Sequence, residues 1–127
     1  MMKTLKTALF VAAVSALAAP AMAHHNVNGA YFSEKTATGA GVLMEVRDIA
    51  PHAHWIFAVT GPNGEMQKWD FETVGNAALR RLGVKIKDDF KVGNTYAYTY
   101  SPSRDGSTTG FLTGITINGK ALKIVQL

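Results

Sequence analysis

Four histidines are the residues of this sequence best suited to chemistry, and they occur as two pairs. His24 and His25 are adjacent, whereas one residue separates His52 from His54. Side chains two positions apart on a β-strand point to the same side and lie ~6.5–7 Å apart along the strand. Two imidazoles at that spacing can reach one metal ion. The candidate metal ligands are therefore His24, His25, His52 and His54.

The kind of metal follows from the available donor atoms. If the mature chain begins at His24, its α-amine and imidazole can chelate one ion as a ring, and a second imidazole completes a three-nitrogen brace. Nitrogen donors without thiolate favour copper, and the chain has no cysteine. Two methionines, Met44 and Met66, could add soft sulfur ligands. The alternative is that the first pair is a polar chain start and that His52 belongs to an ordinary loop or strand end.

Three tyrosines form a second candidate site. Tyr96, Tyr98 and Tyr100 alternate along one predicted strand and therefore share a face. Such a face can be a stacking platform for saccharides or bases, or simply one wall of a barrel.

A catalytic constellation is not apparent in the sequence. Asp88 and Asp89 are adjacent, so in an extended chain their carboxylates point to opposite sides. The glycines at 110 and 114 lack the following lysine and helix of a phosphate-binding loop. Arg104-Asp105-Gly106 has the composition of a turn. We therefore expect that the protein is not an enzyme.

The elements that must position these residues are mostly strands, because period-two alternation dominates from position 42 onward. Gly61-Pro62-Asn63-Gly64 and Asn118-Gly119 predict chain reversals, and Asn76 to Leu82 predicts a short helix. Residues 24–38 resemble a partly free arm. The predicted strands cover 42–46, 54–59, 67–72, 95–100, 111–117 and 122–125.

This order of elements predicts a mainly β fold, a small OB-like five- to six-stranded antiparallel barrel with one short helix. A small open sandwich built from the same elements is the competing architecture. Consistent alternation predicts that Lys68, Asp70 and Glu72 face solvent, whereas the core contains Val42, Trp55, Phe57, Val59, Trp69, Phe71 and Ile115.

Residues 1–23 have the pattern of a cleavable signal peptide: a positive start, an apolar run and Ala21-Met22-Ala23 before the cut. The apolar run is shorter than the roughly 20 residues that span a bilayer, so we expect no membrane span. Residues 24–127 then form a single β-barrel domain, which is periplasmic or secreted. Lys3 and Lys6 leave with the signal, so the mature charge is +2. Scattered charge of that size predicts no nucleic-acid partner.

Several short motifs in a fixed order make the chain similar to the domain-of-unknown-function family 6152, small secreted bacterial proteins with Ala-His-His at the mature N-terminus. The resemblance implies export and a β-rich fold, and it implies no activity. Either His52 or His54 holds the histidine position of that family, because two residues here separate His52 from Trp55. The motifs are Ala23-His24-His25, Pro51-His52, Trp69-Asp70-Phe71-Glu72, Leu79 to Gly83, Val92-Gly93-Asn94 and Pro102 to Gly106.

Two functional hypotheses follow. The first is an exported small β-barrel binding protein that holds copper through His24 and the strand pair His52 and His54. The alternative is a metal-independent interaction module that binds an envelope partner, protein or lipid, or a saccharide.

Overall fold

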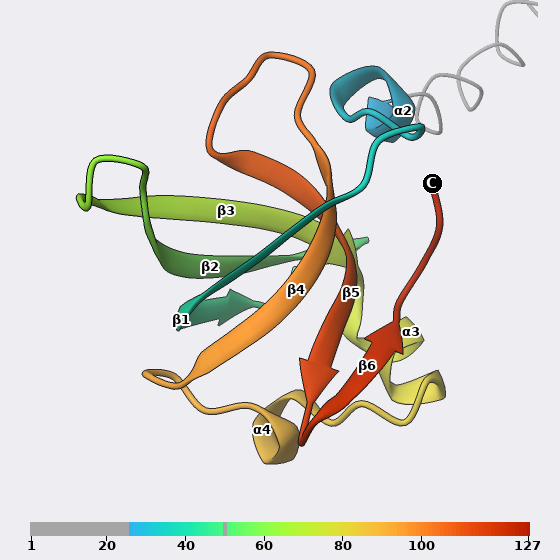
Figure 1. The fold of residues 1–127 in the computed structure, drawn as a ribbon. Coiled ribbons are helices and arrows are strands. Elements are labelled where there is room, and N and C mark those ends of the chain that lie inside the picture. Colours follow the sequence, from blue (N-terminus) through green and yellow to red (C-terminus); the bar gives the residue numbers. More distant parts are fainter. Residues whose placement is uncertain (1–25, 50) are drawn as a thin grey trace, which may run out of the picture.

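The computed structural model describes residues 26–49 and 51–127 (Figure 1). The predicted signal peptide, His24 and His25 lie outside the described residues. Within these ranges six strands dominate, in agreement with the predicted β fold. They are β1 (Ala37–Arg47), β2 (His52–Thr60), β3 (Met66–Val74), β4 (Thr95–Pro102), β5 (Thr109–Ile117) and β6 (Lys120–Lys123).

The strands form one sheet in the order β3-β2-β1-β4-β5-β6, and a further pairing of β3 with β5 closes the first five into a barrel. The β3–β5 pairing is parallel and short, from Asp70 opposite Thr109 to Glu72 opposite Phe111, whereas the other pairings are antiparallel. A closed five-stranded Greek-key barrel of this kind is the OB architecture. The predicted OB-like barrel is therefore confirmed, and the open sandwich is excluded.

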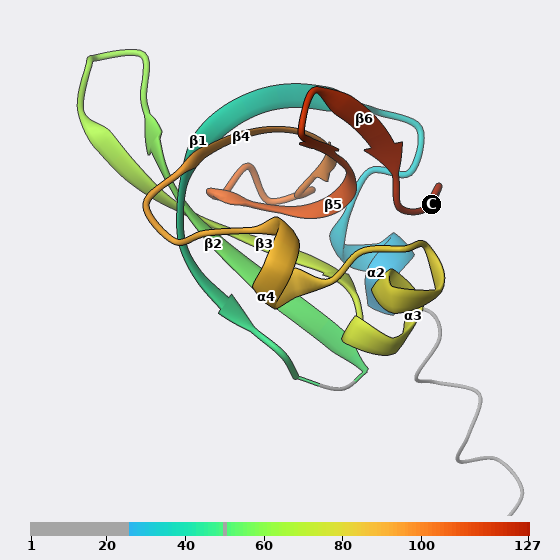
Figure 2. The same cartoon turned by 90° about the horizontal axis from the view of Figure 1, so that it is seen from below.

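One end of the barrel is covered by α3 (Asn76–Arg81) and α4 (Ile86–Asp89), which lie between β3 and β4 in the chain (Figure 2). Leu79 of α3 is buried, and the Phe90 ring lies edge-on to Trp55 with the ring centroids 4.8 Å apart. The sequence predicts α3 but not α4, because a single turn is too short to show helical periodicity.

The core contains most of the predicted residues. Trp55, Phe57, Phe71 and Ile115 are at most 3% exposed. Val59 and Trp69 are half-buried and pack against this core. Among the residues predicted to face solvent, Lys68 is exposed, whereas Asp70 and Glu72 on the same strand are half-buried.

The prediction of which β1 residues face the core is wrong at the centre of the strand. Leu43 is 1% exposed, whereas Met44, which alternates with Val42 and Val46, is 51% exposed. The register of β1 against β2 shifts between Leu43 and Glu45, so Met44 is the extra residue of a β-bulge. Because a bulge reverses the alternation beyond it, Val42 faces outward and Val46 faces the core.

The expected free arm is anchored to the barrel at Tyr31 and Phe32, whereas most of its other described residues are exposed, so that prediction is corrected only in part. After α2 (Asn26–Ala30), Tyr31 is buried and forms an isolated antiparallel bridge with Ser103. The backbone N–H of Arg104 donates to the Ala30 carbonyl at 2.9 Å, and the Arg104 guanidinium lies over the Phe32 ring. The β4–β5 loop therefore fastens this segment to the barrel.

Asp105 organises the same loop, as the turn interpretation expects. Its Oδ1 atom accepts hydrogen bonds from Ser103 Oγ at 2.6 Å and from the Ser107 backbone N–H at 2.9 Å. The bonds from Ser103 and then Ser107 lower the pKa of Asp105 to about 2. Within the described residues, no helix is both long and apolar enough to span a membrane.

Candidate histidine–carboxylate site

The strand histidines lie on the outer face of β2, as their alternation with Trp55 and Phe57 predicts. Both side chains are about one-third exposed. β2 is paired along its whole length with β3, where Glu72 and Asp70 occupy the same outer face. The sheet therefore brings two imidazoles and two carboxylates together.

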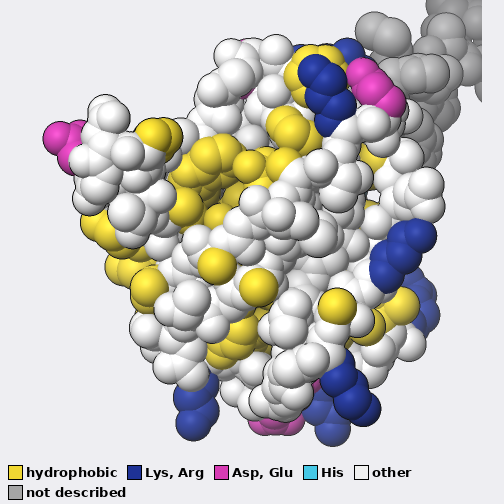
Figure 3. Space-filling model, in the orientation of Figure 1, with side chains coloured by type: hydrophobic (Ala, Val, Ile, Leu, Met, Phe, Trp, Pro, Cys, Tyr) yellow, Lys and Arg dark blue, Asp and Glu magenta, His cyan; other side chains and the backbone are white. Residues whose placement is uncertain are grey.

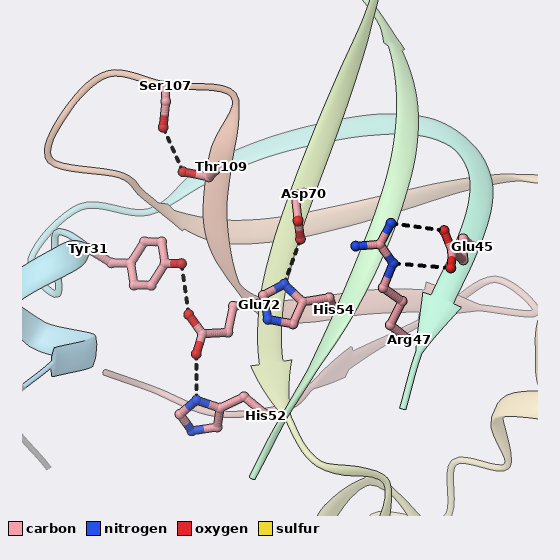
Figure 4. A network of polar contacts seen from close by, with 9 residues as sticks. All are labelled: Tyr31, Glu45, Arg47, His52, His54, Asp70, Glu72, Ser107 and Thr109. Carbon is pink, nitrogen blue, oxygen red and sulfur yellow. Dashed lines mark hydrogen bonds and ion pairs between the residues drawn. The ribbon is translucent and has the colours of Figure 1, made fainter. Parts of the chain in front are cut away.

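Each histidine contacts one carboxylate through the same ring nitrogen (Figure 4). His52 Nδ1 lies 2.5 Å from Glu72 Oε1, and His54 Nδ1 lies 2.8 Å from Asp70 Oδ1. A carboxylate oxygen accepts hydrogen bonds, so in both contacts Nδ1 is the donor. When Nδ1 carries the proton of a neutral imidazole, the lone pair is on Nε2. Both histidines are thus held in the tautomer that can bind a metal through Nε2.

Tyr31 extends the first of these contacts to the N-terminal segment. Its hydroxyl donates to Glu72 Oε2 at 2.9 Å, so one carboxylate joins Tyr31 to His52. Burial, and then the hydrogen bond to Glu72, raise the pKa of the Tyr31 hydroxyl. The phenol therefore remains a hydrogen-bond donor across the physiological pH range.

Phe111 supports this network from the neighbouring strand. It lies opposite Glu72 in the β3–β5 pairing, and it is only 2% exposed although it is on the outer face. Its ring is edge-on to both Tyr31 and His52, with centroid separations of 5.7 and 5.8 Å. The His52 ring is therefore fixed by a hydrogen bond at one nitrogen and by an aromatic contact.

Sequence reasoning missed the partners of the histidines. The alternation of β3 places Asp70 and Glu72 on one outer face, which was an available signal. Alternation could not give the register of these carboxylates against β2, where each histidine contacts a carboxylate diagonally rather than the residue directly opposite. No local signal could have found Tyr31, which is 41 positions from Glu72.

Arg47 borders the site on the β1 side. It lies opposite His54 in the β1–β2 pairing, and its guanidinium pairs with Glu45 at 3.1 Å. The Glu45 hydrogen bond raises the pKa of Arg47, so its charge is permanent. The Glu45 pairing draws this positive charge toward β1 rather than toward the imidazoles (Figure 4).

The outer face of strands 2 and 3 is where OB-type barrels most often bind ligands, between the loops that join strands 1 and 2 and strands 4 and 5. His52 and His54 occupy that face here. Across the described ranges, no cluster of three or more histidine, cysteine or acidic side chains is placed to hold a metal ion.

The fold and the site define a small OB-type barrel with two carboxylate-oriented histidines on the outer face of β2. The chain belongs to a family of unknown function, DUF6152, whose model matches residues 12–113. The resemblance drawn from the motifs is confirmed by this match. A comparison with curated proteins gave no match.

Proposed function

We propose that this protein is an exported, non-enzymatic copper-binding protein, in which His52 and His54 share one ion with the N-terminal histidines of the processed chain. The observation that carries the proposal is the pair of Nδ1–carboxylate contacts. Metal-binding histidines usually donate their second ring N–H to a carboxylate, which fixes the ring and makes the other nitrogen more basic. His52 with Glu72 and His54 with Asp70 have this arrangement.

The anchoring of Tyr31 supports the part assigned to the N-terminus. Seven positions separate His24 from Tyr31, and α2 uses five of the residues after His25. A five-residue helix is only ~7.5 Å long, and two further residues add at most ~7 Å. Because Tyr31 is bonded to Glu72, this length of chain would allow a processed N-terminus to reach the strand histidines.

Copper is the metal that this donor set favours. The α-amine and up to four imidazoles supply nitrogen, and the affinity order of divalent metals for such donors peaks at Cu²⁺. Glu72 and Asp70 also place negative charge behind the rings, which favours binding of a cation. The signal-peptide pattern of residues 1–23 supports export. Cleavage after Ala23 would then free the α-amine of His24 for metal binding.

The test is a Cu²⁺ titration of the processed chain that begins at His24. Comparison proteins carry one extra alanine before His24, or the substitutions His52→Ala or His54→Ala. Lys68→Ala is the matched control, because Lys68 is exposed on the outer face of the same sheet. We expect each of the first three changes to weaken binding, and Lys68→Ala to leave it unchanged.

A second variant tests the orienting carboxylate. Glu72→Gln should lower copper affinity about 10–100-fold, the usual effect of removing a group that orients a metal ligand. Binding should also weaken as the pH falls, because protons compete with the metal for the imidazole nitrogens. If the extra alanine and both histidine substitutions leave the affinity unchanged, the proposal is wrong.

A further inference from the structure

The two ends of the barrel differ. The α3–α4 segment covers one end, whereas hydrophobic side chains gather in a hollow between β3 and β4 (Figure 3). These two strands are not neighbours in the sheet. Trp69 of β3 and Tyr100 of β4 meet across the gap, edge to face, with ring centroids 5.6 Å apart. Both residues are half-buried, so part of each ring remains accessible.

A rigid aromatic layer supports these two rings. Trp69 stacks on the fully buried Phe71 at 5.5 Å and 22°, and Tyr100 contacts Phe71 at 5.0 Å. Gly110 lies beside them, and a Cβ atom there would be 2.7 Å from Tyr100 Cδ2. The accessible rings are therefore held in place before any ligand arrives.

Two uncharged polar groups accompany these rings, the Gln67 amide and the Tyr100 hydroxyl. Trp69 Nε1 donates to Gln67 Oε1 at 3.3 Å, which leaves the donors of the Gln67 amide for other partners. Burial raises the pKa of Tyr100, so its hydroxyl stays neutral.

An aromatic floor with neutral amide and hydroxyl groups fits a sugar ring. The C–H groups of a pyranose carry slight positive charge and pack on the negative face of an aromatic ring. Its hydroxyls can pair with the Gln67 amide and the Tyr100 hydroxyl. Nucleic acid fits less well, because its phosphates require lysine or arginine, which these side chains do not supply.

We propose that Trp69 and Tyr100 bind one pyranose ring of a neutral saccharide. This site is separate from the histidine site, because Trp69 lies on the inner face of β3, opposite Phe57, whereas Asp70 lies on its outer face. The proposal stands independently of metal binding.

The probes are the neutral oligosaccharides cellohexaose, maltohexaose and hexa-N-acetylchitohexaose, titrated against the chain that begins at His24 and followed by tryptophan fluorescence. Trp55 is 1% exposed, so only Trp69 responds to the quencher acrylamide. We expect at least one probe to protect Trp69 from quenching. Loss of a stacking ring in Trp69→Ala should weaken binding of that probe, measured by calorimetry, about tenfold or more.

Gln67→Ala is the second variant, and it should weaken binding while the aromatic core stays intact. Lys68→Ala and His54→Ala should bind the saccharide as the unchanged chain does, which separates this site from the metal site. Binding of none of the three probes would overturn the proposal. Binding of that probe to Trp69→Ala and to Gln67→Ala with the affinity of the unchanged chain would also overturn it. So would an apolar dye that binds in the hollow and that no probe displaces.

Discussion

Tyr31 and Glu72 are 41 positions apart, and the Tyr31 hydroxyl donates a 2.9 Å hydrogen bond to Glu72 Oε2. This bond connects the segment that follows α2 to the carboxylate that orients His52. Its consequence is that the N-terminal segment and the histidine site form one polar network (Figure 4).

Tyr31→Phe should release this segment while the ring stays on Phe111. The hydrogen bond has a charged acceptor in a half-buried position, so its loss should cost about 1–2 kcal/mol of unfolding free energy. Amide hydrogen exchange in residues 26–34 should become faster. Tyr31→Ala should cost more, because it also removes the aromatic contact with Phe111. Unchanged exchange in Tyr31→Phe would show that the bond does not anchor the segment.

The outward position of Met44, the bulge residue of β1, gives a second prediction, with the buried Phe71 as the comparison. Phe71 is fully buried, so Phe71→Ala should lower the unfolding free energy by about 3–5 kcal/mol. Met44 is 51% exposed, so Met44→Ala should change it by less than about 0.5 kcal/mol. Urea unfolding of the two variants measures both values. A comparable loss in Met44→Ala would contradict the outward position of the bulge residue.

Gly110 should tolerate no side chain. A Cβ atom there would lie 2.7 Å from Tyr100 Cδ2 and 3.1 Å from Phe71 Cε1. Gly110→Ala should therefore cost about 1–3 kcal/mol through forced movement of the aromatic rings. Gly29→Ala is the matched control, because it lies in α2 with no atom within 4 Å of the added Cβ. Thermal unfolding of both variants checks the prediction, and equal melting temperatures would refute it.

Stability should fall at alkaline pH in part because of Tyr98. Burial, with a smaller effect of Tyr100, raises the pKa of Tyr98 from 10.0 to about 12. Between these values the folded chain keeps a proton that the unfolded chain loses, so the unfolding free energy decreases as the pH rises. Below pH 10 this contribution is fully present.

Tyr98→Phe removes that group, so its unfolding free energy should decrease less steeply between pH 10 and 12. The slope should not vanish, because burial also raises the pKa of Tyr31 and Tyr100. Urea unfolding at a series of pH values gives both slopes. Parallel curves for the variant and the unchanged chain would rule out Tyr98 as a contributor.

Much of the fold and half of the described site could be predicted locally. Period-two alternation is a property of neighbouring residues, so it placed Trp55 and Phe57 inside and His52 and His54 outside. It failed at Met44, because a bulge depends on how β1 pairs with β2, and neighbouring residues do not specify that pairing. The carboxylate partners of the histidines depend on strand register, which alternation does not specify.

By itself, the sequence determined the strand segments, the position of α3, the outward direction of the strand histidines and the membership in DUF6152. Each depends on residue types at short spacing. Only the tertiary structure decided the parallel closure of β3 on β5 and the contacts of Glu72 with both His52 and Tyr31. The physical reason is that barrel closure brings together strands and loops that are distant in the chain, and their relative register is set by packing of the whole core.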